Sequence, residues 1–277
     1  MNIMFCGDSK ILDGLIISIL SILKNTKEEL HIYILTMKYQ NEYHQYQPLD
    51  QKSIEYIEII VRNTNKNSFI KLIDITDIVN NYPPRANIKT RFTPYCMLRL
   101  YADLVEDIPA KLLYLDTDVV CLKNPKELYD MEIDKYELVG ALDYYGSHFY
   151  RKKIYRKDYL NSGVLLLNMY QLKSKNILLK ARRRCKWRKM LLPDQTSLNI
   201  LCRKKKIVSR KFNEQRKIRE DTVFRHFTTI FKVWPTLHTQ TIKPWNIDEL
   251  HDILNVHEFD DILEQYIKVK EGLNNEQ

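Results

Sequence analysis

Residues 112–120 read Leu-Leu-Tyr-Leu-Asp-Thr-Asp-Val-Val: four apolar residues run directly into two carboxylates, and apolar residues then resume. The apolar run predicts a buried strand. Residues i and i+2 of a regular strand point the same way, so Asp116 and Asp118 would face the crevice at the carboxyl end of a parallel sheet. A divalent cation with a preference for oxygen ligands would relieve the repulsion between them. A strand-to-turn junction whose Asp side chains cap nearby backbone is the alternative.

The chain on either side alternates between strand and helix patterns, which predicts an α/β fold with a mostly parallel central sheet flanked by helices. The expected strands are 2–5, 30–35, 54–61, 112–115, 137–142 and 164–167, and the expected helices are 12–23, 95–104, 171–188, 194–203 and 248–270. No internal repeat and no Gly-, Ser- or Pro-rich linker divides the chain. We therefore expect one domain over 1–246, which contains a basic helical segment at 173–219, and a C-terminal amphipathic helix within 247–277.

Composition excludes several classes of protein. The 277 residues are 44% apolar, which fits a globular core, and the longest apolar stretch, 14–23, is about half of a membrane span. The sequence has neither the Gly-x-Gly-x-x-Gly pattern of dinucleotide sites nor a P-loop. Five scattered cysteines argue against a disulfide framework and a structural zinc site. With no secretion signal, they predict a cytoplasmic protein.

Positive charge is concentrated in one segment. The net charge is +9, but residues 173–219 hold 18 Lys and Arg against two Asp and Glu, so the remainder is mildly acidic. Such a block indicates an anionic partner, namely membrane lipid, nucleic acid or a charged glycan, unless it is only a solvated helix face. No nucleic-acid recognition motif is present, so we expect docking on the anionic inner face of the membrane and no nucleic-acid binding.

Several short motifs, in order along most of the chain, resemble those of the family 8 glycosyltransferases, which include glycogenin and bacterial lipopolysaccharide galactosyl- and glucosyltransferases. The motifs are Asn2-Ile-Met-Phe-Cys-Gly-Asp8, Arg99 placed 17 residues before Asp116, the Asp-x-Asp itself, Asn161-Ser-Gly-Val-Leu-Leu-Leu-Asn168, Leu192-Pro-Asp-Gln195 and Lys243-Pro-Trp245. The resemblance implies a GT-A fold and a retaining, metal-dependent transferase.

The resemblance also implies a donor site. Asp116 and Asp118 would bind Mn²⁺ (or Mg²⁺) that bridges the two phosphates of a UDP-sugar, and the metal would act as a Lewis acid. The remaining donor contacts that it implies are Cys6 and Asp8 at the uracil, Arg91, Arg99 and Thr117 on the donor side, Asn161 and Gly163 around the sugar, and Lys243 at the diphosphate. Read without the resemblance, Arg99 would be a helix-surface ion pair.

Three residues are expected at the reacting carbon. Asp194 and Gln195 match the Asp-Gln pair of the family, with Gln195 near the anomeric carbon, although Leu-Pro-Asp alone would only start a helix. Asp143 follows an apolar strand and would bind sugar hydroxyls, and the alternative for Asp143 is a turn or N-cap residue.

The third metal ligand departs from the pattern of the family, which has a histidine after a strand and then a short Gly-containing loop before Lys-Pro-Trp. His226 follows an apolar strand but lies 17 residues before Lys243, whereas His238 lies five residues before it without such a strand. Residues 239–242 contain no glycine. Spacing slightly favours His238.

The sequence therefore predicts a cytoplasmic glycosyltransferase that moves glucose or galactose from a UDP-sugar to a hydroxyl of a glycan, glycolipid or glycoprotein acceptor. No residue is an obvious covalent nucleophile, which favours same-face attack. Two alternatives stay open: a metal-dependent nucleotidyltransferase, and a non-catalytic protein that binds anionic surfaces on a degenerate glycosyltransferase fold.

Overall fold

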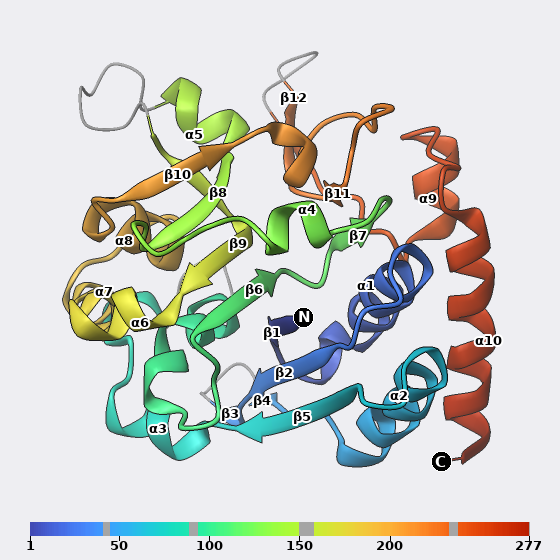
Figure 1. Cartoon of the computed structure of the whole chain (residues 1–277), viewed down its shortest axis with the longest axis horizontal. Coiled ribbons are helices and arrows are strands. Elements are labelled where there is room, and N and C mark those ends of the chain that lie inside the picture. The colour runs from blue at the N-terminus through green and yellow to red at the C-terminus, as the bar shows by residue number, and fades with distance from the viewer. Residues whose placement is uncertain (41–44, 89–93, 150–157, 233–237, 277) are drawn as a thin grey trace.

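The computed structural model places one twisted sheet between layers of helices (Figure 1). It describes residues 1–40, 45–88, 94–149, 158–232 and 238–276. The sheet has seven strands in the order β10-β8-β9-β6-β1-β2-β5. Their bounds are β1 Asn2–Cys6, β2 His31–Thr36, β5 Phe69–Asp74, β6 Lys111–Leu115, β8 Leu138–Leu142, β9 Leu160–Asn168 and β10 Lys205–Val208.

Most strand pairs of this sheet are parallel, which confirms the predicted fold class. The exception is β9, which runs antiparallel to both β6 and β8. Val164 of β9 pairs with Leu115 of β6, and Leu160 pairs with Leu142 of β8. The first residues of β9 therefore lie beside the carboxyl ends of two neighbouring strands, where ligands bind in α/β sheets.

Three two-stranded ribbons complete the strands of the described part of the chain. They pair β3 Tyr39–Gln40 with β4 Gln45–Tyr46, β7 Val119–Cys121 with β11 Phe224–His226, and β12 Ile230–Lys232 with β13 His238–Gln240. The second ribbon matters most for the site, because it sets His226 opposite Val119, directly after the two acids.

Helices cover both faces of the sheet. The α-helices are α1 Leu12–Asn25, α2 Gln51–Thr64, α3 Thr76–Asn81, α4 Lys126–Tyr129, α5 Tyr144–Phe149, α6 Met169–Ser174, α7 Ile177–Trp187, α8 Pro193–Leu201, α9 Ile247–Asp252 and α10 Asp260–Glu276, and 3-10 helices span Ser9–Ile11, Arg85–Asn87, Pro94–Leu104 and Arg210–Phe212. Successive residues of β1 point to opposite faces: Ile3 and Phe5 join the core under α1, α2 and α10, and Met4 joins the core under 94–104, α7 and α8.

The strand expected at 54–61 is wrong, because these residues form the middle of α2 (Figure 1). Ile54, Ile57 and Val61 are buried at helical spacing, so the helix presents one apolar stripe to the core. Asp50 caps its first turn and accepts hydrogen bonds from the backbone N–H of Lys52 at 3.0 Å and of Ser53 at 2.9 Å.

Other helices are confirmed with changed bounds. The helix expected at 171–188 is divided into α6 and α7 at Asn176, whose left-handed backbone (φ 55°) interrupts a helix. The helix expected at 248–270 is α9 followed by α10, and the one expected at 95–104 is the 3-10 helix Pro94–Leu104. Within the described residues, no helix is both long and apolar enough to cross a membrane.

The last helix is tied to the first. Tyr266 of α10 donates to the Asp13 carboxylate of α1 at 2.9 Å, and the Lys270 ammonium lies 2.8 Å from the same carboxylate. Apolar side chains of α10 such as Leu263 join the core that α1 and α2 share. This contact holds α10 along the side of the sheet opposite α6–α8 in Figure 1.

Candidate active site

Asp116 and Asp118 lie in a turn rather than on a regular strand, so the expected strand geometry is wrong. β6 ends at Leu115, and the Val119 N–H donates to the Asp116 carbonyl oxygen at 3.2 Å, which closes the turn before β7. Both carboxylates nevertheless face one imidazole. Nε2 of His226 is 3.1 Å from Asp118 Oδ1 and 3.7 Å from Asp116 Oδ2.

His226 is held from behind by two amides. Its Nδ1 is 3.1 Å from Asn161 Oδ1 and 3.2 Å from Asn213 Oδ1, so Nδ1 carries a proton that one of these oxygens accepts. Nε2, the other ring nitrogen, faces the two carboxylates. A histidine that binds a metal is typically held in this way, with its other ring nitrogen hydrogen-bonded to a carbonyl oxygen.

The ligand atoms of Asp116, Asp118 and His226 all lie within 4.8 Å of one another. Two carboxylate oxygens and one imidazole nitrogen suit Mn²⁺ or Mg²⁺. A second such group among the described residues, His251, His257 and Asp260, comes from α9, α10 and the segment between them.

Two residues of the expected site cannot be placed in it. The backbone of His238 pairs with Lys232 in the β12–β13 ribbon, but its side chain lies outside the described residues. Arg91 also lies outside them. The structure brings His226 against both acids, while the preference for His238 that its spacing gave stays a prediction.

Arg99 contacts several residues of the site, and its side chain is only 3% exposed. Its guanidinium donates to Asp116 Oδ1 at 2.7 Å and to the Ser162 carbonyl at 2.5 Å, and its Nε lies 3.3 Å from Asp194 Oδ2. It also lies over the ring of Tyr114, 3.8 Å from the centroid. One buried cation thus joins β6, the start of β9 and the start of α8.

Lys243 holds the other acid. Its ammonium is ion-paired with Asp118 Oδ2 and donates to the Phe227 carbonyl at 3.0 Å. Burial alone would raise the pKa of the Asp118 carboxyl, but Lys243 and His226 outweigh burial and hold that pKa well below its ordinary value. Asp118 therefore stays ionised, as a metal ligand must.

Asp143, Asn161 and Gln195 form a connected network. Asp143 Oδ2 accepts from Asn161 Nδ2 at 2.8 Å and from Gln195 Nε2 at 3.2 Å. Gln195 Oε1 accepts from the Ser162 N–H at 2.9 Å. Asp143 Oδ1 accepts from the Gly146 N–H, so the capping alternative for this residue holds at the same time. These bonds bring together residues expected at the reacting carbon.

Asp194 begins α8 and lies between Arg99 and Ser162. Burial raises the pKa of its carboxyl, and the Arg99 guanidinium opposes that rise. Its second contact is with the Ser162 hydroxyl at 3.4 Å. These contacts place Asp194 behind the network, where it orients Arg99.

Gly163 makes room for the imidazole of His226. A Cβ at Gly163 would lie 2.1 Å from His226 Cε1 and 2.4 Å from Nδ1. Its carbonyl accepts from the Asp116 N–H at 2.8 Å, which ties β9 to the turn.

The turn with the two acids also packs closely on α1. A Cβ at Gly14 would lie 2.5 Å from the Thr117 carbonyl oxygen and 2.6 Å from Cζ3 of Trp245. Trp245 therefore packs between α1 and the turn, which is a structural position. Cys6 ends β1, and the buried Asp8 caps the next turn through the Lys10 N–H at 3.3 Å.

The geometry is that of a candidate metal site at the carboxyl end of β6, and the comparison with protein families identifies the family of the chain. Residues 2–248 match the model of Glycosyl transferase family 8. The chain belongs to glycosyl transferase family 8.

Two curated proteins are similar to this family 8 chain. A lipopolysaccharide 1,2-glucosyltransferase of Escherichia coli is 28% identical over 256 residues, which are 80% of this chain and 69% of that protein. A protein of Haemophilus influenzae that is named as a glycosyltransferase is 28% identical over 229 residues, which are 77% of this chain. The chain spans 63% of the length of the Haemophilus protein.

Solved structures of the same fold confirm the GT-A architecture. The galactosyltransferase LgtC, in a complex with donor and acceptor sugar analogues, has a TM-score of 0.67 at 16% identity, over 97% of this chain and 95% of LgtC. The bifunctional glycosyltransferase WbbM has a TM-score of 0.69 at 14% identity, over 98% of this chain and 51% of WbbM.

Sequence reasoning missed three residues of this family 8 site. Asn213 donates to Asn161 Oδ1 at 2.9 Å and also contacts His226, but no local pattern marks it. Tyr114 donates to Asp116 Oδ1 at 2.6 Å and is one of the four apolar-run residues, where it was counted only as core. Ser162 lies inside the Asn-Ser-Gly motif, and this motif was the available signal.

Proposed function

We propose that this chain transfers a hexose, glucose or galactose, from a UDP-sugar to a hydroxyl of a glycan, lipid-linked or protein-linked acceptor, with retention at the anomeric carbon. One observation carries the proposal: Asp116 Oδ2, Asp118 Oδ1 and His226 Nε2 converge at the carboxyl end of β6 in a family 8 chain. The named activities of the E. coli relative and of LgtC support a hexose. Family membership favours this function over a nucleotidyltransferase.

Asp116, Asp118 and His226 would hold Mn²⁺ or Mg²⁺. When bound, the ion supplies a Lewis acid that neutralises charge on the departing diphosphate. Lys243 is long and flexible enough to exchange its contact with Asp118 for a phosphate oxygen, and so adds a positive charge to the same group. Cys6, through its backbone, and Asp8 would contact the uracil.

The proposed transfer needs no covalent nucleophile. The acceptor hydroxyl oxygen bonds to the anomeric carbon as the bond from that carbon to the diphosphate oxygen breaks. The electron pair of that bond leaves with UDP, and the hydroxyl proton passes to the leaving phosphate oxygen. Asp143, Asn161 and Gln195, which share hydrogen bonds, would orient the donor sugar on one face. A glycosyl adduct on Asp143 or Gln195, detected by mass spectrometry, would contradict same-face attack.

Arg99 and Asp194 would act as positioning residues. Both are almost fully buried, and each already has protein partners. Arg99 orients Asp116 through a short charge-assisted hydrogen bond and so sets the geometry of the metal ligands.

We further propose that α7 and the residues after it rest on an anionic membrane surface. Lys180, Arg183 and Lys189 are exposed, and Trp187 and Leu191 beside them are 72% and 67% exposed. Cations next to exposed apolar side chains fit the boundary between charged headgroups and acyl chains. The basic segment also contains structural charges, such as Arg182, which is buried against Asp103.

The test of the transferase is UDP release from a panel of UDP-hexoses, with Mn²⁺ and then with EDTA. We expect metal-dependent release from one donor, and we expect Asp118→Asn to lower the rate about 100-fold or more, since loss of a metal ligand removes several kcal/mol of transition-state stabilisation. Asp107→Asn is the matched control, because Asp107 is exposed and only pairs with Lys71 at the surface.

UDP binding, measured by thermal shift with Mn²⁺, separates a missing acceptor from a wrong proposal. Stabilisation by UDP with Mn²⁺, lost in Asp118→Asn, supports the site even if no donor on the panel reacts. Release that is insensitive to EDTA, or no stabilisation at all, would overturn the proposal.

A further inference from the structure

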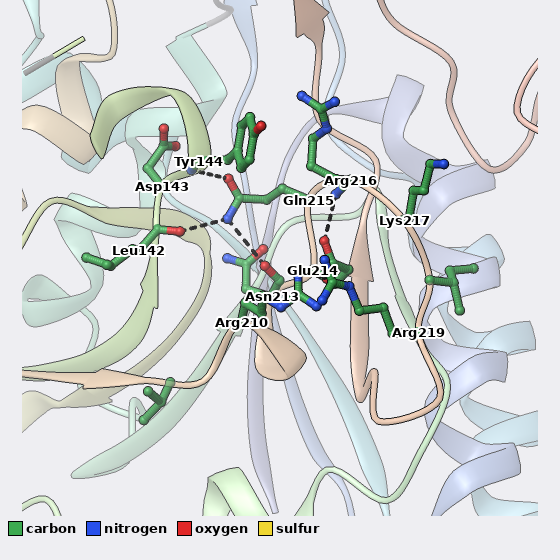
Figure 2. Close-up of a pocket in the computed structure, with 12 residues that line it drawn as sticks. Leu142, Asp143, Tyr144, Arg210, Asn213, Glu214, Gln215, Arg216, Lys217 and Arg219 are labelled. Carbon is green, nitrogen blue, oxygen red and sulfur yellow. Dashed lines mark hydrogen bonds and ion pairs between the residues drawn. The ribbon is translucent and has the colours of Figure 1, made fainter. Parts of the chain in front are cut away.

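A hollow opens beside the proposed sugar site. It has a volume of about 580 Å³, within the range of small-molecule sites. Figure 2 draws the residues that line it. We call it the cationic pocket. Its lining residues are Leu142, Asp143, Tyr144, Val208, Arg210, Asn213, Glu214, Gln215, Arg216, Lys217, Ile218 and Arg219.

The cationic pocket is joined to the active site through shared residues. Asp143 lines the pocket and accepts hydrogen bonds from Asn161 and Gln195 of the site. Asn213 lines it too, and contacts His226. Gln215 links the loop that lines the pocket to the end of β8 and the start of α5. Its amide donates to the Leu142 carbonyl at 3.0 Å, and its Oε1 accepts from the Tyr144 N–H at 2.9 Å (Figure 2).

Four cations line this pocket, and only two of them have a carboxylate partner. Glu214 is buried, and its Oε2 lies 3.3 Å from Arg210 and 3.6 Å from Arg219. Within the described residues, neither Arg216 nor Lys217 forms an ion pair. Arg216 lies over the Tyr144 ring, 4.5 Å from its centroid, and its guanidinium is 3.4 Å from the Tyr145 hydroxyl.

The two remaining cations are neighbours in the sequence and line the same pocket. Arg216 and Lys217 are exposed, and their side chains extend from the loop in the same direction (Figure 2). Glu214 fixes the start of this loop, because its Oε1 accepts from the Arg216 N–H at 3.0 Å. An exposed Arg–Lys pair on an anchored loop, next to a pocket with apolar walls, suits a ligand that has both a ring and an oxyanion.

We propose that the cationic pocket binds the acceptor, and that this acceptor carries an anionic group, a phosphate or a carboxylate, which Arg216 and Lys217 hold. The acceptor hydroxyl would then point toward Asp143. The inference rests on the proposed transfer reaction and adds the chemical class of its second substrate.

The experiment measures binding without turnover. Galactose, galacturonic acid, galactose 6-phosphate and inorganic phosphate are titrated by NMR into the wild-type chain and into two double variants. Arg216→Gln/Lys217→Gln removes the two cations. Arg203→Gln/Lys204→Gln is the matched control, since this exposed Arg–Lys pair precedes β10 and does not line the pocket.

We expect both charged sugars to bind about tenfold or more tightly than galactose, because hydrogen bonds to charged groups are stronger than neutral ones. The preference disappears in Arg216→Gln/Lys217→Gln and persists in the control. Equal binding of neutral and charged sugars, or an unchanged preference in Arg216→Gln/Lys217→Gln, overturns the inference. Inorganic phosphate that binds as tightly as galactose 6-phosphate also overturns it, since the site would then hold a free anion only.

A second readout separates this inference from the proposed function. It is the ratio of UDP release with and without each sugar, measured with Mn²⁺ and the reactive UDP-hexose. A charged acceptor should raise this ratio in the wild-type chain and in the control but not in Arg216→Gln/Lys217→Gln. If no UDP-hexose reacts and UDP with Mn²⁺ does not stabilise the chain, the transfer reaction is contradicted, while the binding titration still decides the charge preference of the pocket.

Discussion

Residue 163 must be glycine because the His226 imidazole fills the space that a side chain there would need. The site needs the imidazole between the two acids and the two asparagines, and a side chain at 163 would occupy the same space. We expect Gly163→Ala to displace the imidazole, to weaken Mn²⁺ binding about 10- to 100-fold, and to cost about 1–3 kcal/mol of unfolding free energy. Calorimetric Mn²⁺ titration and urea unfolding measure the two effects.

The double variant Gly163→Ala/His226→Ala tests the cause. With the imidazole removed, the new methyl group has space, so Gly163→Ala should cost less stability in this background than in the wild-type chain. Mn²⁺ affinity should stay low in both. Additive losses of stability would show that the methyl group clashes with something other than His226.

At the scale of the element, helix α2 begins at a single polar capping residue, Asp50. Asp50 ends the preceding loop and caps the helix that was expected to be a strand. The Ser53 hydroxyl and the backbone N–H groups of the first turn hold the pKa of the Asp50 carboxyl below its ordinary value of 3.8, although partial burial opposes this. Its stabilising contribution is therefore complete above that value and is lost as the pH falls through the lower pKa of the folded state.

We expect Asp50→Ala to lower the unfolding free energy by about 1 kcal/mol at neutral pH. Asp50→Asn keeps a capping side chain and lacks the titration, so the wild-type chain should lose stability relative to Asp50→Asn once the pH falls below 3.8. Urea unfolding of the three proteins from neutral pH down to about pH 3 measures this. A difference that does not change with pH would contradict the assigned role of the carboxylate.

At the scale of the whole molecule, some basic residues of the segment 173–219 form ion pairs that support the fold, and others are exposed at the surface. Part of the basic segment is used inside the protein, as in the pairs of Lys175 with Glu137 and of Lys205 with Asp158. Other basic residues are exposed, including one group on and after α7 and another on the loop of the cationic pocket. The two exposed groups lie on different elements, so their roles can be separated by substitution.

We expect Arg183→Gln/Lys189→Gln to weaken partition onto phosphatidylserine vesicles about 30-fold at low ionic strength, at about 1 kcal/mol per basic residue. Vesicle co-sedimentation over a salt series measures the effect. Lys66→Gln/Lys268→Gln is the control, because both lysines are exposed and lie outside the basic segment. Equal loss in the two variants would indicate a response to net charge alone and no defined membrane face.

The sequence by itself determined the α/β class, most of the strands and helices, the acid pair after a buried strand, and the family, but not the helix at 51–64 or the strands β5 and β10. These features are local: apolar periodicity, a capping residue and short motifs are all contained within a few neighbouring residues. The wrong prediction of a strand at 54–61 also comes from local reasoning, because a short apolar run fits either a strand or a helix. The structure decides for a helix, since the run packs one apolar stripe against the core.

Only the tertiary structure decided which residues surround the acids. His226 reaches Asp118 because β11 pairs with β7, and Asn213 reaches Asn161 from 52 positions away along the chain. Arg216 and Lys217 looked like two of 18 basic residues until the fold set them beside Asp143. Contacts of this kind depend on strand pairing and loop packing, and a pattern of neighbouring residues contains no information about either.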